Sequence, residues 1–401
     1  MTTALQPASA DQRVAAAVEL TGDFAARAGV HDRDASFPFA NIRQLSEAGL
    51  LSLTVPIEYG GDGLGLGPVR RVVEQIARGD ASTALVLAMH YLMHAAATRE
   101  RRWPAEVHRL VCESSVQEGG LINTLRVEPE LGTPARGGLP ATIARRVADG
   151  WRISGHKLYA TGSPALRWML VWARTDDAEP LVGAFLVPHD APGIQIVETW
   201  DHLGMRATGS HDVLFDEVMV PAEFAVDVRR PAERTAPSPL ATAWNCVVVS
   251  AVYHGVALAA RDWLVRYLHE RVPSNLGASL ATLPRFQATV GQIEALLHTS
   301  DRLLAAVSDE ADAAEVSGPG AQPFSHLATS ATLAKLTVTG NAIRAVELGL
   351  ELTGNPGLSR RNPLERHYRD VLCSRVHTPQ DDTILALAGR VALDAAAPSP
   401  D

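Results

Sequence analysis

The sequence predicts an α+β fold in three parts: a helical N-terminal domain (residues 1–118), a central antiparallel β-barrel (residues 119–230) and a C-terminal four-helix bundle (residues 231–401). Three observations predict it. Apolar residues at helical spacing fill the first third of the chain. Alternating residues with frequent glycine and proline follow, and helical texture returns after a Pro-rich joint at 228–240. A chain of 401 residues is long enough for two or three such domains.

The first part carries helix signals in three stretches. Residues 37–53 place Phe39, Ile42, Leu45 and Leu50 near helical spacing. Residues 68–100 predict two further helices with a break at Gly79-Asp80, and residues 103–115 predict another, with a proline in its first turn.

The middle part carries strand signals from Gly119-Gly120 to about residue 221. The stretches 151–163, 167–175, 182–188 and 211–221 alternate in polarity, and turn residues separate them at short intervals. No Gly-x-Gly-x-x-Gly run follows a strand, and strands do not alternate with helices. The sequence therefore disfavours a Rossmann-type dinucleotide fold.

The last part predicts three long helices, over residues 242–270, 285–314 and 326–354, the last ending at Gly354. Residues 317–323, rich in glycine and proline, are expected to link two of these helices.

Composition excludes several classes of protein. The net charge of −9 and the absence of a basic cluster argue against nucleic-acid binding, and the only lysines are Lys157 and Lys335. The three widely spaced cysteines indicate neither a disulfide framework nor a zinc site. We expect no signal peptide, no membrane-spanning segment and a cytoplasmic location.

Four motifs in order resemble the acyl-CoA dehydrogenase superfamily over about nine-tenths of the chain. They are the loop VPIEYGGDGLG (55–65), the strand pair at 153–175, the strands at 193–221 and the segment LERHYRDV (364–371). The resemblance implies a helix–barrel–helix fold, a flavin between the barrel and the C-terminal helices, and a homotetramer in which a partner subunit contacts the adenosine end of FAD.

The resemblance also implies a set of flavin contacts. Tyr159 and Thr161 match positions that cover the flavin ring and bind its polar edge, and Ser163 could bind flavin N5. A flat apolar ring needs one packed face and hydrogen-bond partners along its polar edge. The cofactor is expected to be FAD, or alternatively reduced FMN supplied by a separate reductase. The predicted cofactor-binding residues are Tyr159, Thr161, Ser163, Glu128, Gly132, Thr133, Gln287 and Gly354.

The dehydrogenases of this superfamily need a carboxylate base, and both of its usual positions are empty here. Counting from Arg369-Asp370, one position falls on Thr378, and the other lies near Asn245. A threonine hydroxyl is too weak a base for this reaction. Asp381 and Asp382, about one helical turn further on, are the alternative bases.

His377 offers different chemistry. In the related two-component flavin monooxygenases, such as those acting on dibenzothiophene, a histidine occupies this loop and reduced flavin reacts with oxygen to give a C4a-hydroperoxide. A histidine there can donate a hydrogen bond or remove a proton, because its pKa lies near the working pH. The predicted catalytic residues are His377, Ser163 and Asn123. His90, His94 and His254 are interpreted as core histidines, and no metal is expected.

Three functions stay open at this point. The first is a flavin monooxygenase acting on a small molecule, the second is an acyl-CoA dehydrogenase with a displaced base, and the third is a non-catalytic binding protein. The sequence does not name the substrate or the atom that is oxidised.

Overall fold

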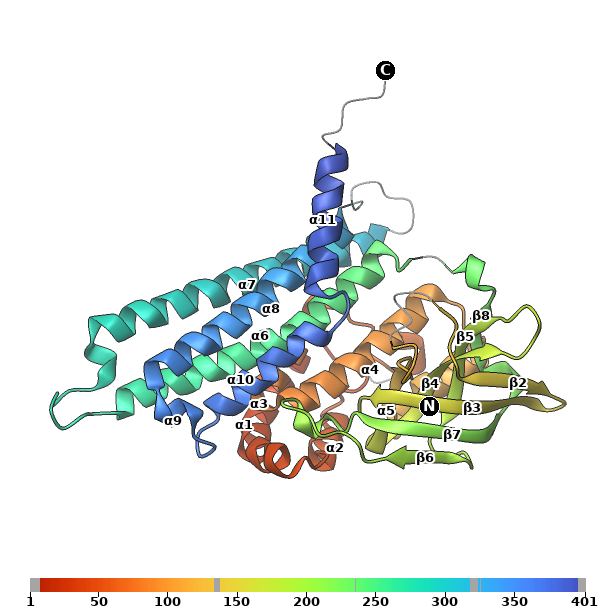
Figure 1. Ribbon diagram of the computed structural model, residues 1–401, viewed down its shortest axis with the longest axis horizontal. Helices are drawn as coiled ribbons and strands as arrows, with labels where there is room; N and C mark the ends of the chain where they lie inside the picture. The colour runs from red at the N-terminus through yellow and green to blue at the C-terminus, as the bar shows by residue number, and fades with distance from the viewer. Residues whose placement is uncertain (1–7, 133–137, 235, 318–323, 325, 396–401) are drawn as a thin grey trace, which may run out of the picture.

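The computed structural model describes residues 8–132, 138–234, 236–317, 324 and 326–395. The β-sheet lies at one end of the molecule, the N-terminal helices lie next to it, and the long C-terminal helices extend away from it (Figure 1). This arrangement confirms the predicted fold class.

The described part of the N-terminal region contains five α-helices. Asp80 caps the fourth of them, since its side chain accepts a hydrogen bond from Thr83 N. The predicted break at Gly79-Asp80 is therefore confirmed as the end of one helix and the cap of the next. The helices are α1 (Ala10–Asp34), α2 (Phe39–Glu47), α3 (Leu66–Gly79), α4 (Ala81–Glu100) and α5 (Ala105–Gln117).

The eight strands form one sheet in the order β6-β7-β3-β2-β4-β5-β8, with β1 also paired to β4. The sheet is mixed and not wholly antiparallel as predicted. β2 and β4 both run opposite to β3, and β4 pairs with β2 on the side away from β3, so this pairing is parallel. The pairing of β1 with β4 is also parallel. The strands are β1 (Leu121–Leu125), β2 (Ile143–Val147), β3 (Gly150–Ala160), β4 (Leu166–Thr175), β5 (Val182–Pro188), β6 (Ile194–Val197), β7 (His211–Val220) and β8 (Ala225–Arg229).

The C-terminal region packs long helices around α6, whose contacts run mainly to α8, α3 and α7. The three predicted long helices are present, and part of the predicted linker at 317–323 lies outside the described residues. The helices are α6 (Pro239–Glu270), α7 (Pro284–Ser317), α8 (Leu327–Thr353), α9 (Asn355–Leu358), α10 (Leu364–Leu372) and α11 (Asp381–Ala395).

Helix α6 corrects one statement made from the sequence. Within the described residues it is long and apolar enough to cross a membrane, although no such segment was expected. However, 83% of its apolar window is buried inside the protein, as is usual for a core helix of a folded domain.

Helix α11 is the exception to this packing. It projects from the bundle beside α8 (Figure 1), and only its first turns are anchored, where Ile384 is buried. The remaining large apolar side chains, Leu385, Leu387, Val391 and Leu393, are exposed.

Candidate active site

The loop between α10 and α11 meets helix α6. Asn245 on α6 donates a hydrogen bond from Nδ2 to the carbonyl oxygen of Thr378, at 2.9 Å. The two positions where a dehydrogenase base was expected are therefore direct neighbours in space. Neither carries an acid, and the amide of Asn245 is already committed to the loop backbone.

His377 is bound to a tyrosine of the same helix. Its Nε2 lies 2.6 Å from the hydroxyl of Tyr253, which is fully buried, whereas His377 is partly buried. Burial, together with the positive charge of Lys335, lowers the pKa of His377 to about 4. The imidazole is consequently neutral at physiological pH.

Lys335 lies behind this loop as a buried cation. Its Nζ is 3.8 Å from Asp381 Oδ1, and neither atom has a hydrogen-bond partner among the described residues. Burial lowers the pKa of the Lys335 ammonium. Asp382 Oδ1 accepts a hydrogen bond from Thr383 N in the first turn of α11. Both alternative bases thus face other groups of the chain, and this geometry does not favour either as a proton acceptor.

Tyr159 presents an aromatic surface at the edge of the sheet. Its φ of 56° is in the left-handed region, which is uncommon for a bulky residue, and its side chain is 51% exposed. Trp200 and His202 stack with ring centroids 3.7 Å apart, and both meet Tyr159 edge-on. The three rings form an open surface that a flat ring system could cover.

A line of hydroxyl groups runs beside this surface. Thr161 Oγ1 lies 2.9 Å from Ser210 Oγ, which lies 2.7 Å from Thr208 Oγ1. Asn123 donates from Nδ2 to the carbonyl oxygen of Thr161. Asn123 therefore holds the backbone of a predicted flavin-binding residue, and its own side chain is almost fully buried.

Two of the predicted site residues are engaged inside the protein. Ser163 is fully buried and donates its hydroxyl to the carbonyl oxygen of Gly209 at 2.8 Å. Glu128 is buried and accepts hydrogen bonds from Lys157, Thr142 and the backbone of Ala141. These bonds indicate structural roles, and contacts of either residue with flavin stay predictions.

The remaining predicted contacts are not gathered at this surface. Gly132 pairs with Glu128 through two backbone hydrogen bonds, and Thr133 lies outside the described residues. Gln287 lies in the first turn of α7 and Gly354 directly precedes α9, which lies at the end of the bundle away from the sheet (Figure 1). No hydrogen bond joins either residue to Tyr159 among the described residues, and their contacts with flavin stay predictions.

The two halves of the site are joined by α10. Asp370 Oδ1 accepts a hydrogen bond from Met205 N at 2.7 Å, and Arg369 donates to the carbonyl oxygen of Leu203 at 2.9 Å. These bonds fix the Trp200–His202 loop against the helix that leads to His377. Burial raises the pKa of Asp370 to about 7.

Sequence reasoning missed Tyr253 as a partner of His377, and it missed Ser210, Trp200 and Lys335. One usable signal was present for Lys335, because a chain with 36 lysines and arginines contains only two lysines. No local pattern marks Tyr253, since its partner lies 124 residues away.

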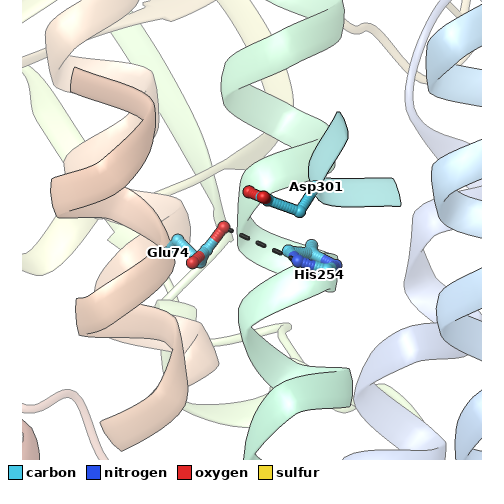
Figure 2. Close-up of side chains that lie close together, drawn as sticks. All are labelled: Glu74, His254 and Asp301. Atoms are coloured by element: carbon cyan, nitrogen blue, oxygen red, sulfur yellow. Dashed lines mark ion pairs between the residues drawn. The ribbon is translucent and has the colours of Figure 1, made fainter. Parts of the chain in front are cut away.

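A second group of titratable residues joins α3, α6 and α7. Glu74, His254 and Asp301 point toward one another (Figure 2), with ligand atoms within 4.8 Å of each other. Arg70 already occupies this group, since its Nη1 lies 2.9 Å from Asp301 Oδ1 and 3.4 Å from Glu74 Oε2. A metal ion would have to displace or tolerate that guanidinium, so the group is best described as an ion-pair junction.

Glu74 is expected to make stability depend on pH in an unusual direction. Burial raises its pKa to about 7 from an ordinary 4.5, so between these values the folded state binds more protons than the unfolded state. Folding stability from this group therefore falls as pH rises through that window, by up to about 3 kcal/mol. Glutamine cannot ionise, so Glu74→Gln does not lose this stability as pH rises. The free energy of unfolding of Glu74→Gln relative to wild type should therefore increase from pH 4.5 to 7.

Urea unfolding midpoints at several pH values measure this difference. His254 has its pKa lowered to about 4 and changes stability in the opposite direction; because it lies 3.7 Å from Glu74, the comparison is repeated in a His254→Gln background. Glu106→Gln, an exposed acid paired with Arg109, is the control. A difference between Glu74→Gln and wild type that stays constant with pH would refute the expectation.

Comparison with known proteins assigns this architecture to a family. Three acyl-CoA dehydrogenase domain models match the chain in order: the N-terminal domain at residues 13–101, the middle domain at 126–218 and the C-terminal domain at 247–381. YdbM of Bacillus subtilis, a protein assigned to the acyl-CoA dehydrogenases, is 33% identical over 91% of this chain and 92% of its own. L-evernosamine nitrososynthase of a Micromonospora species is 30% identical over 86% and 81%, respectively.

Solved structures agree. KijD3, in complex with FMN and a dTDP-linked amino sugar, superposes with a TM-score of 0.82 at 27% identity, covering 98% of this chain and 97% of that one. The dibenzothiophene monooxygenase TdsC of Paenibacillus shares the fold, with a TM-score of 0.83 at 22% identity and coverage of 97% and 99%.

The relatives that share this helix–sheet–helix fold are flavin-dependent oxidoreductases, among them dehydrogenases, monooxygenases and nitrososynthases. The chain belongs to the acyl-CoA dehydrogenase family, as its motifs predicted.

Proposed function

We propose that this protein is a flavin-dependent monooxygenase that receives reduced flavin from a separate reductase. One observation carries the proposal. The two places where a dehydrogenase base would stand are Asn245 and Thr378, and they are hydrogen-bonded to each other. The group next to them is a neutral histidine, which suits hydrogen bonding to a reactant better than removal of a carbon-bound proton.

The sheet edge fits a flavin. The open face formed by Tyr159, Trp200 and His202 can pack against a flat ring, and Thr161 is partly exposed beside it. When bound, a reduced flavin supplies the electrons that activate oxygen. The residues of this chain would hold the ring, keep water away and place a hydrogen-bond donor opposite it.

The polar residues of the site have separate roles in this proposal. The hydroxyl of Thr161 would meet the ring edge, the buried hydroxyls of Ser210 and Thr208 support it from inside the protein, and Asn123 fixes the Thr161 backbone. His377, held by Tyr253 of α6, would meet the reactants from the bundle side. Preorganised groups of this kind lose little free energy to reorientation during the reaction.

The substrate is proposed to be a small molecule, and an amine nitrogen is the first atom to test as the site of oxidation. Nitrososynthases are among the proteins that match this chain at 30% identity, and KijD3 binds a dTDP-linked amino sugar. A dTDP-linked amino sugar is therefore a reasonable first compound for a substrate screen.

A second candidate function is acyl-CoA dehydrogenation, which the similarity to YdbM favours. It would need Asp381 to leave Lys335 and reach the substrate, or another base to act. Anaerobic addition of an acyl-CoA to the oxidised flavoprotein tests it, since a dehydrogenase would lose its flavin absorbance at once.

Rapid mixing tests the primary proposal. The protein is loaded with reduced flavin without oxygen and then mixed with oxygenated buffer while absorbance is followed. We expect a transient spectrum that persists before oxidised flavin returns, and a longer lifetime than for free flavin under the same conditions. Immediate return of oxidised flavin, combined with bleaching by acyl-CoA, would replace the proposal with the second candidate.

We also propose that the protein is a homo-oligomer, in agreement with the tetramer that its resemblance implies. The exposed apolar side chains of α11 support this, because soluble chains rarely leave such a helix uncovered. Light scattering of the full chain and of Leu387→Glu measures the molar mass, and a monomer for the unaltered chain would contradict the proposal.

A further inference from the structure

Tyr253 and His377 form an isolated pair of neutral groups. Tyr253 lies on α6 and is fully buried, and its hydroxyl has one hydrogen-bond partner among the described residues, His377 Nε2 at 2.6 Å. Burial raises the pKa of Tyr253 well above its usual value, and the nearby Cys373 and Asp370 act in the same direction. The phenol therefore keeps its proton.

The imidazole is also neutral, so it carries one proton, on Nδ1 or on Nε2. These two forms differ in which group donates across the 2.6 Å contact. With the proton on Nε2, the histidine donates to the phenol oxygen, and the phenol proton is left without an acceptor. With the proton on Nδ1, the phenol donates to Nε2 and both groups of the contact are satisfied.

Burial decides between the two forms. A buried donor without a partner costs about 1–3 kcal/mol, and Tyr253 has no contact with solvent that could relieve this cost. The Nδ1 atom of His377 is in a different position. His377 is partly exposed, and among the described residues its Nδ1 is not one of the buried polar atoms that lack a partner. The Nδ1–H form leaves no buried proton unsatisfied.

We propose that Tyr253 is a positioning residue that fixes His377 as its Nδ1–H tautomer, so that His377 meets the reactants as a hydrogen-bond donor and not as a base. The catalytic part of this statement rests on the proposed function, whereas the tautomer does not. The hydrogen bond from Asn245 to Thr378 O holds the next residue of the same loop, so ring and backbone are both anchored to α6.

The charges around the pair are consistent with this role. Lys335, a cation, disfavours protonation of the imidazole, and Asp370 disfavours ionisation of the phenol. Proton transfer from Tyr253 to His377 would create a tyrosinate beside Asp370 and an imidazolium near Lys335. Both neighbours oppose that step, so the pair acts as a fixed support and not as a proton relay.

Nitrogen NMR of selectively labelled histidine tests the tautomer directly. The His377 signals are assigned by difference with His377→Gln, and the protonated nitrogen is read from the two ring shifts. We expect Nδ1 to be protonated in the unaltered protein and the two tautomers to mix in Tyr253→Phe. Tyr91→Phe is the matched control, because it removes another buried phenol, bound to Leu50 O, far from His377 in the chain.

Either of two results would contradict the assignment of His377 as the Nδ1–H tautomer. One is a protonated Nε2 in the unaltered protein, and the other is a Tyr253→Phe spectrum identical to that of the control. This readout needs no substrate and no turnover, so it stands even if the oxygen experiment fails.

Paired substitutions test the donor role. Asparagine places an amide N–H near the position of Nδ1, whereas glutamine places its amide near Nε2. We expect His377→Asn to keep at least about tenfold more oxygenation activity than His377→Gln. Equal activities, or more activity with glutamine, would show that the Nδ1–H group is not the one that acts.

Discussion

His377→Ala is expected to lower the oxygenation rate by about 100-fold or more while leaving flavin binding nearly unchanged. Removing a single preorganised donor or acid–base group typically costs a factor of this size. His377 contacts Tyr253 and no residue of the aromatic surface in the described contacts, so the cofactor surface should survive the change. Product formation and flavin titration, measured on the same preparation, separate the two effects.

His298→Ala supplies the control, because His298 is exposed on α7 and contacts neither half of the site. Full activity of His377→Ala would remove His377 from the mechanism. A loss of flavin binding equal to the loss of rate would assign it to the cofactor site instead.

Lys157→Met is expected to destabilise the protein by about 3–5 kcal/mol, the usual cost of removing one partner from a buried ion pair. Lys157 is fully buried, 2.6 Å from Glu128 Oε1, and it also donates to the carbonyl oxygen of Trp172. Burial lowers its pKa to about 8. Burial would raise the pKa of Glu128, but hydrogen bonds from Lys157 and Thr142 outweigh it and the pKa is lowered. Without Lys157, a buried carboxylate loses its counter-charge.

Lys335→Met is the matched comparison, because Lys335 is the other buried lysine and has no hydrogen bond among the described residues. Lys335→Met should lower the free energy of unfolding much less than Lys157→Met does, because it removes a charge whose burial is already unfavourable. Urea unfolding of the two variants and of the double variant Glu128→Gln/Lys157→Met measures these effects. Equal losses for both lysines would show that the Glu128 pair does not determine the cost.

Much of the fold was predictable because its signals are local. The break at Gly79-Asp80 follows from a glycine and a capping side chain, and the long helices follow from apolar spacing. Strand positions were also predictable, but strand directions were not. The parallel pairing of β1 with β4 joins segments about 45 residues apart, and no local pattern encodes on which side of β2 the chain returns.

Some features of the candidate site were also predictable from local sequence, and others were not. Motif spacing predicted that Thr378 and Asn245 would stand where a base is expected, and the structure places them together. The engagement of Glu128 with Lys157, and of Ser163 with Gly209, depends on tertiary contacts that residue types alone do not reveal. Tyr253 belongs to an apolar helix, where the sequence predicts a core or pocket-lining role equally well and does not indicate the bond to His377.

Both lysines of the chain are buried, and its other basic side chains are arginines and histidines. The folded surface therefore offers no lysine amine to acylating reagents or to enzymes that modify lysine. A lysine-specific protease would likewise find no accessible cleavage site until Lys157 or Lys335 is exposed. Digestion by such a protease would thus report opening of the sheet at one residue and of the helical bundle at the other, without any engineered label.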